Sequence, residues 1–185
     1  MKIWKLLGHS LFAEDETAKK VRFGLSVVFF VYFCILIKCV VFKYPYEQLA
    51  QITESWTKKV ILEGLDTANF TLFKTIKMYI RYWARLNSFE NLFGNIFLFS
   101  PFGFLLPFLH KESRYWWILM INVFWVVCGI EIFQLITAFG AFDVDDILLN
   151  CLGAFLGYLC FGLVYQNGRK QFLTDTEDTT SSTAA

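Results

Sequence analysis

The stretch GAFDVDDILLNCLGAFLGY, residues Gly140–Tyr158, decides the fold of this chain. It opens with three carboxylates and continues as an apolar run of membrane-spanning length; the carboxylates are Asp143, Asp145 and Asp146. On an α-helix, four residues of this stretch fall in one narrow stripe: Asp146, Asn150, Gly153 and Gly157. Polar groups are costly in hydrocarbon, so the stripe indicates a functional site or a contact between helices.

The composition is that of a membrane protein. The 185 residues are 56% apolar and 19% aromatic, which is too apolar for an ordinary soluble domain. Four runs are long enough to cross a hydrocarbon core about 30 Å thick. They are residues 23–42, 92–109, 115–135 and 147–165. The predicted fold is therefore all-α: a polytopic bundle of four transmembrane helices, with an interfacial amphipathic helix.

That amphipathic helix lies in the long loop 43–91. From Phe73 to Arg85, one helical face carries apolar residues and an adjacent face carries basic ones. The apolar face holds Phe73, Ile76, Ile80 and Trp83, and the basic face holds Lys74, Lys77, Arg81 and Arg85. This pattern is typical of a helix at headgroup depth. Its basic side chains either extend from the membrane surface into water or meet phosphates of a lipid or cell-wall polymer.

Lysine and arginine placement predicts the orientation. Residues 1–22, the 110–114 loop and the segment after the fourth run are basic, whereas the 136–146 loop has three Asp and no basic residue. We therefore expect a multi-pass plasma-membrane protein with both termini in the cytoplasm and the acidic loop outside. The basic residues of loop 43–91 oppose this orientation, but long loops weigh less. Residues 166–185 are polar and are predicted to be disordered.

In this topology, most polar groups of the spans lie in the outer half of the bilayer, which indicates a shared polar cleft. The candidate cleft residues are Asn91, Asn95, Glu131, Gln134, Asp143, Asp145, Asp146 and Asn150. The possible charge partners are Lys38, Lys74, Lys77 and Arg81. A purely structural reading is equally open: amides can join helices, Glu131 can pair with Lys38, and aspartates can cap a helix. Gly153 and Gly157 are predicted to pack against a neighbouring helix.

The chemistry is less specific than the architecture. Asp143, Asp145 and Asp146 could hold a divalent cation such as Mg²⁺ through oxygen ligands, although no metal or other cofactor is assigned. Alternatively, a buried Glu131 could act as an acid or base. No hydrolase triad, phosphate-binding loop or zinc motif is present, so no catalytic residue is assigned. The net charge of +1 argues against a nucleic-acid partner, and the five cysteines are expected to be reduced packing residues.

Three segments in this order resemble the VanZ-like family of bacterial membrane proteins. They are NLFGNIFLFSPFGFLLPFL (Asn91–Leu109), EIFQL (Glu131–Leu135) and DVDDILLNCLGAFLGY (Asp143–Tyr158). NFTLFKTI (Asn69–Ile76) is similar to a further family segment, with Leu72 in place of a proline. The resemblance covers residues 69–165, inside a predicted transmembrane domain of 23–165. Many members carry an arginine where this chain has Gly140, so another cation is expected to neutralise the acids.

The resemblance implies a Gram-positive-type host and low-level resistance to teicoplanin-like lipoglycopeptides. It favours a protein, not assigned as an enzyme, that lowers access of the antibiotic to the cell surface or alters an envelope lipid or polymer. One alternative is a membrane enzyme that acts on a phospholipid or polyprenyl-phosphate head group. A second alternative is a structural membrane scaffold.

Overall fold

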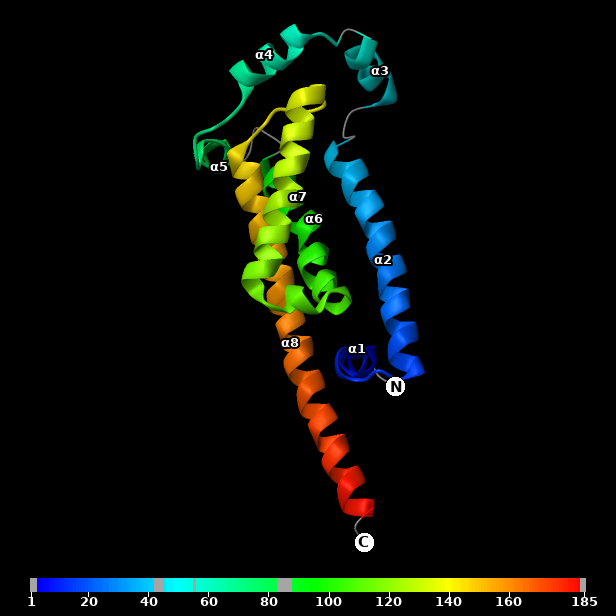
Figure 1. Ribbon diagram of the computed structural model, residues 1–185. Coiled ribbons are helices and arrows are strands. Elements are labelled where there is room, and N and C mark those ends of the chain that lie inside the picture. Colours follow the sequence, from blue (N-terminus) through cyan, green and yellow to red (C-terminus); the bar gives the residue numbers. More distant parts are fainter. Residues whose placement is uncertain (1–2, 42–44, 55, 83–87, 184–185) are drawn as a thin grey trace.

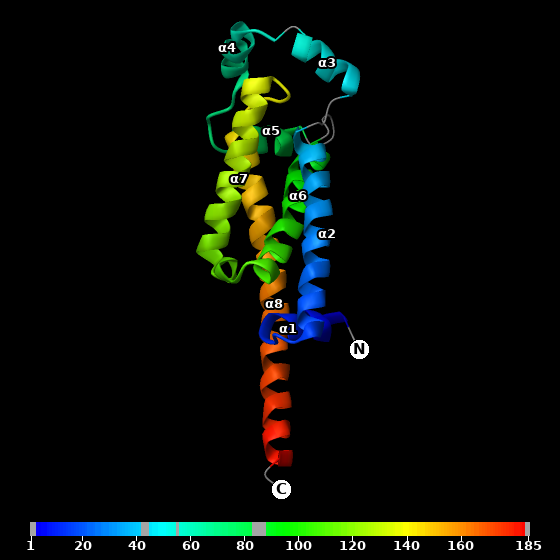
Figure 2. The same ribbon diagram turned by 45° about the vertical axis from the view of Figure 1, so that its right-hand side comes forward.

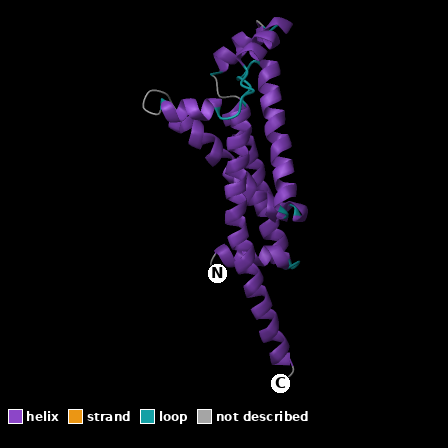
Figure 3. Cartoon of the chain, turned by 90° about the vertical axis from the view of Figure 1, so that its left-hand side faces the viewer, coloured by secondary structure: helices purple, strands orange, loops and turns teal. Residues whose placement is uncertain are grey.

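The computed structural model describes residues 3–41, 45–54, 56–82 and 88–183, and nearly all of them are helical (Figures 1 and 3). The helices are α1 (Ile3–Phe12), α2 (Glu16–Val41), α3 (Tyr46–Glu54), α4 (Lys58–Thr67), α5 (Lys74–Arg81), α6 (Ser88–Leu109), the 3₁₀ helix η1 (Lys111–Arg114), α7 (Trp116–Thr137) and α8 (Val144–Thr183). No strand occurs within these four ranges; two residues, Asn69 and Asp143, form an isolated parallel bridge.

Four helices are long and apolar enough to cross a membrane, which confirms the predicted fold class. The candidate spans are Glu16–Val41, Asn91–Leu109, Trp116–Thr137 and Val144–Thr174. They form a bundle with α1 at one end and α3–α5 at the other (Figures 1 and 2). Both termini lie at the α1 end (Figure 1), as expected for an even number of spans.

The closest helix contact joins α6 to α8. A Cβ added at Gly157 would overlap the Ser100 carbonyl oxygen, and one at Gly153 would overlap that of Ile96. Glycine therefore allows the two backbones to approach closely, as the spacing of Gly153 and Gly157 predicts. Pro101 and Pro107 both lie inside α6 without ending it.

A core of aliphatic and aromatic side chains joins the other spans to this pair. Phe99, Leu119, Val123 and Val127 are fully buried in it, together with Leu36 from α2. The Tyr32 hydroxyl donates to the Leu98 carbonyl oxygen at 2.5 Å, which ties α2 to α6. The five cysteines are all free. Cys128 and Cys151 are partly buried, as expected for packing residues, whereas Cys34, Cys39 and Cys160 are exposed.

α8 continues past its candidate span to Thr183, and α1 lies across the part of α8 around Gly168 (Figure 1). Gly8 and Gly168 meet backbone to backbone: a Cβ on Gly8 would lie 2.7 Å from the Gly168 Cα. Phe12 stacks on Phe172 with ring centroids 5.9 Å apart. Residues 166–183, predicted to be disordered, are thus helical. The turns around Gly168 and Phe172 pack against α1.

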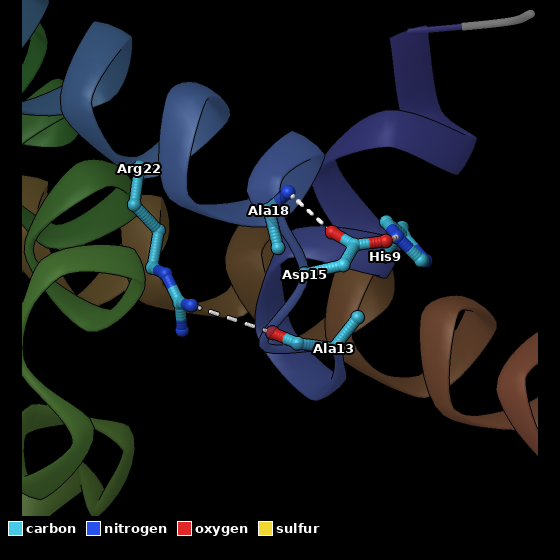
Figure 4. Close-up of polar contacts among 5 residues, drawn as sticks. All are labelled: His9, Ala13, Asp15, Ala18 and Arg22. Carbon is cyan, nitrogen blue, oxygen red and sulfur yellow. Dashed lines mark hydrogen bonds and ion pairs between the residues drawn. The ribbon is translucent and has the colours of Figure 1, made fainter.

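Asp15 organises the junction between α1 and α2 (Figure 4). Its carboxylate accepts the Ala18 amide at 2.7 Å and contacts His9 Nε2 at 2.8 Å. Arg22 donates to the Ala13 carbonyl oxygen at 3.4 Å. Asp15 therefore caps the start of α2, as aspartate does at helix N-termini, and joins it to α1.

At the opposite end, α3, α4 and α5 lie across the bundle rather than along it (Figures 1 and 2). Trp56 Nε1, just before α4, donates to the Ile136 carbonyl oxygen of α7 at 2.8 Å. α4 itself also contacts α7. α5 contacts both α6 and α8, which places the predicted amphipathic helix beside the acidic start of α8.

Candidate functional site

Asp145 binds the beginning of α5. Its carboxylate accepts the backbone N–H groups of Phe73 at 2.5 Å, Thr75 at 2.8 Å and Ile76 at 3.1 Å. The Asp145 side chain is fully buried. Phe73 has a left-handed backbone (φ 63°) and supplies no side-chain cap of its own. Asp145 therefore acts as the N-terminal cap of α5 from about 70 residues away along the chain.

Asp143 joins the segment before α5 to the start of α8. Asn69 exchanges backbone hydrogen bonds with Phe142 and Val144, and its side-chain amide donates to Asp143 Oδ1 at 2.8 Å. The Thr75 hydroxyl donates to Asp143 Oδ2 at 2.5 Å. Both oxygens of Asp143 thus accept protein donors.

Glu131 and Asp146 extend the network to α7 and α6. Glu131, which is 1% exposed, accepts the Asp143 amide at 3.1 Å. Asn95 donates from Nδ2 to Asp146 Oδ1 at 2.7 Å. Five of the eight predicted cleft residues are therefore joined in the structure: Asn95, Glu131, Asp143, Asp145 and Asp146, together with Asn69 and Thr75. We call the three aspartates the acidic cluster.

The remaining predicted residues lie at different positions. Gln134 is buried and donates from Nε2 to the Val40 carbonyl oxygen at 2.8 Å, which joins α7 to α2. Asn150 is buried one turn below Asp146, and its Oδ1 has no hydrogen-bond partner within the described part of the chain. Asn91 is exposed at the start of the second span.

The predicted cations do not neutralise the cluster through ion pairs. Lys38 is exposed on α2, and the described residues give it no ion pair with Glu131. Lys74, Lys77 and Arg81 are exposed on α5. The positive end of the α5 dipole and its three N–H groups instead stabilise Asp145. A Cβ added at Gly140 would lie 3.0 Å from the Gln134 Cδ.

Tyr79 of α5 reports the negative charge of the cluster. Its pKa is raised above 10.0, first by burial and then by the charges of Asp146 and Asp143.

The donors around the acidic cluster fit a structural joint better than a metal site. Hard cations need several carboxylate or carbonyl oxygens turned toward one point. Here N–H and O–H groups occupy those directions at Asp143 and Asp145. Across the described ranges, no group of three or more His, Cys, Asp or Glu residues could hold a metal ion.

Sequence reasoning did not assign Asn69 and Thr75 to the site. The signal that could have identified them is the NFTLFKTI segment, in which Asn69, Phe73, Thr75 and Ile76 all touch the cluster. Two of these contacts use only backbone amides, so residue type alone could not predict them.

Comparison with known proteins places the chain in a family. No solved structure matches it. Protein VanZ of Enterococcus faecium is 34% identical over 80 residues, which are 41% of this chain and 47% of that protein. The chain thus matches about half the length of this curated relative. The VanZ/LLP1 family model matches residues 29–165, a range that includes at least part of each span and the whole acidic cluster. The chain therefore belongs to the VanZ/LLP1 family.

Proposed function

We propose that this VanZ-family membrane protein lowers the access of teicoplanin-type lipoglycopeptides to the cell surface through the exposed face of α5. The observation that carries the proposal is the capping of α5 by the buried Asp145, which fixes a short cationic helix across one end of the bundle. In this proposal that end faces outward, as the distribution of basic residues predicts.

The exposed face of α5 has the chemistry of a membrane interface. Lys74, Lys77 and Arg81 are exposed cations, and Ile80 is 62% exposed beside them. Cations on a helix at headgroup depth attract phosphate groups, and exposed apolar side chains enter the acyl region. We infer that α5 engages phosphate-bearing envelope lipid or polymer and so alters the surface on which an acylated antibiotic would insert.

The acidic cluster has a supporting role in this proposal. Its carboxylates accept hydrogen bonds from the protein itself, so they hold α5 and are not offered to a substrate. This observation favours a binding protein over an enzyme that acts on head groups.

The test is expression in a susceptible Gram-positive host with susceptibility measured for teicoplanin and for a glycopeptide without an acyl chain. The triple variant Lys74→Gln, Lys77→Gln, Arg81→Gln should lose the protection against teicoplanin. A matched triple variant at the α1 end, Lys20→Gln, Arg169→Gln, Lys170→Gln, should keep it. Immunoblots must show equal amounts of both proteins in the membrane.

Surface labelling provides the orientation arm of the same experiment. In a cysteine-free background, a cysteine at the exposed Ala141 should react with an impermeant reagent in intact cells, and one at the exposed His110 should not. Protection that survives the α5 triple variant, or labelling at His110 alone, would contradict the proposal.

A further inference from the structure

A large cavity lies at the end of the bundle opposite α5. Its volume is about 870 Å³, and it lies between η1 and the part of α8 from Tyr158 to Gln166. η1 supplies Lys111, Glu112 and Arg114 to its wall, and α8 supplies Leu159 and Leu163. α8 continues beyond η1, toward the part where α1 lies across it (Figure 2).

The cavity wall carries more positive than negative charge. Two cations, Lys111 and Arg114, face one carboxylate, Glu112. Arg114 donates from Nε to the Pro107 carbonyl oxygen at 3.2 Å and from one terminal nitrogen to that of Leu11 at 3.4 Å. A guanidinium has five N–H groups, so these two bonds hold it in place and leave donors for an anion.

The surroundings of Arg114 show that its charge is incompletely hydrated. Burial lowers the pKa of Arg114, and the nearby charge of Arg22 lowers it further, while Tyr165 and Glu112 raise it. Lys111 is exposed, and its contact with Glu14 is long, at 3.4 Å. Both cations would therefore gain from an added negative charge.

The depth of the cavity is that of the boundary between head groups and acyl chains. Tyr115, Trp116 and Trp117 are more than half exposed at the start of α7, next to η1. Exposed tyrosine and tryptophan at the end of a span mark the membrane–water interface. Leu159 and Leu163, 50% and 65% exposed, continue the cavity wall as an apolar surface on α8.

We propose that this cavity binds one anionic glycerophospholipid of the leaflet at the α1 end. Its phosphate contacts Lys111 and Arg114, and an acyl chain lies along Leu159 and Leu163. Basic recesses between transmembrane helices recognise lipids in this way. The site lies at the opposite end of the bundle from α5, so it does not depend on the proposed function.

The test measures lipid binding to the purified full-length protein by native mass spectrometry, with thermal stability as a second reading. The probes are phosphatidylglycerol, phosphatidylcholine and glycerol phosphate, which lacks acyl chains. Phosphatidylglycerol should bind more tightly than phosphatidylcholine and should raise the unfolding temperature. Lys111→Gln should weaken its binding about fivefold, the effect of one basic residue near a membrane surface.

Two pairs of variants separate this site from general lipid contact. Leu163→Trp fills the cavity from an exposed position, and Leu152→Trp places the same side chain on α8 outside it. Lys20→Gln controls for the charge change of Lys111→Gln. Weaker phosphatidylglycerol binding in Leu163→Trp and Lys111→Gln, with normal binding in both controls, is the expected result.

Three outcomes would overturn the proposal. One is equal binding of phosphatidylglycerol and phosphatidylcholine. Another is equal behaviour of the cavity variants and their controls. The third is displacement of phosphatidylglycerol by glycerol phosphate alone, which would make the site one for a free phosphate compound. Arg114 is left unchanged because its two backbone hydrogen bonds also support the fold.

Discussion

Replacing Asp145 by Asn tests whether the acidic cluster holds α5. The Asp145 carboxylate accepts three backbone N–H groups at 2.5, 2.8 and 3.1 Å and is shielded from water. Asparagine keeps the shape but has a single acceptor oxygen, so at least one of the three amides would face an NH₂ group. A buried donor without a partner costs about 1–3 kcal/mol.

This cost falls on α5 rather than on the whole bundle. α5 has eight residues and no buried side chain, so it contributes little packing of its own. A loss of about 1–3 kcal/mol corresponds to about 5- to 150-fold easier opening of its first turn. Hydrogen exchange reports such local openings, because the amides of Phe73, Thr75 and Ile76 exchange only when the cap is released.

The assay is hydrogen exchange by mass spectrometry in lipid nanodiscs, with peptides that cover 70–82. Asp145→Asn should speed exchange there and leave the α6 and α8 peptides protected. Asp66→Asn, an exposed aspartate of α4, is the matched control and should change nothing in this peptide. Unchanged exchange across α5 in a folded Asp145→Asn protein would refute the capping argument.

Two further predictions concern the rest of the fold. Gly157→Ala should lower the free energy of unfolding by at least about 1–3 kcal/mol, because it forces α6 away from α8. Gly129→Ala, whose Cβ meets open space, should be tolerated. Thermal unfolding in detergent compares the two variants. The pKa of Asp15 is lowered below 3.8, chiefly by the hydrogen bond from the Ala18 amide and then by His9. The ionised Asp15 therefore stabilises the α1–α2 junction above pH 3.8, and this stabilisation is lost as the pH falls through the lowered pKa. Proteolysis of the junction should accelerate on acidification in the wild type and stay independent of pH in Asp15→Asn, which keeps the cap.

The spans could be predicted because membrane insertion depends on local properties of the chain. Each run of about 20 apolar residues is sufficient by itself to define a helix across the bilayer. The glycine contact of α8 was also visible, since Gly153 and Gly157 share one helical face whatever the partner. The partner helix, α6, was not, because it offers Gly153 and Gly157 backbone carbonyl groups that every residue carries, and its one glycine in the contact, Gly103, is a weaker signal than a pair.

Only part of the polar network, and not its role, could be read from the sequence. The polar residues of three spans were expected to converge, and Asn95, Glu131 and the acidic cluster do so. Their role depends on what they bind. Asp145 binds amides of residues 73–76, whose side chains give no sign of it, so a polar cleft and a helix cap looked alike in the sequence.

The prediction for the C-terminal part of α8 was wrong: residues 166–183 are helical, although disorder was predicted for them. The composition of residues 166–185 argues for disorder, since charged and small polar residues bury little apolar surface. The two aromatic contacts of Phe12 with Tyr165 and Phe172 change this balance for the first turns. A contact with α1, far away in the sequence, decided the local structure.

The three adjacent carboxylates are best explained by the number of elements that they join. The Asp145 carboxylate accepts backbone N–H groups of α5. The Asp143 carboxylate accepts donors from Asn69 and Thr75, and the Asp143 backbone amide donates to Glu131 of α7. The Asp146 carboxylate accepts the side-chain amide of Asn95 in α6. A single carboxylate has too few acceptor positions for these donors. Because Asp145 and Asp146 lie in the first turn of α8 and Asp143 directly precedes it, any displacement of that turn must move α5 with it. The position of the cationic helix α5 is thereby coupled to the packing of α6, α7 and α8. A substitution deep in the α6–α8 contact should therefore disturb the position of α5 more than that of α1, at the other end of the bundle.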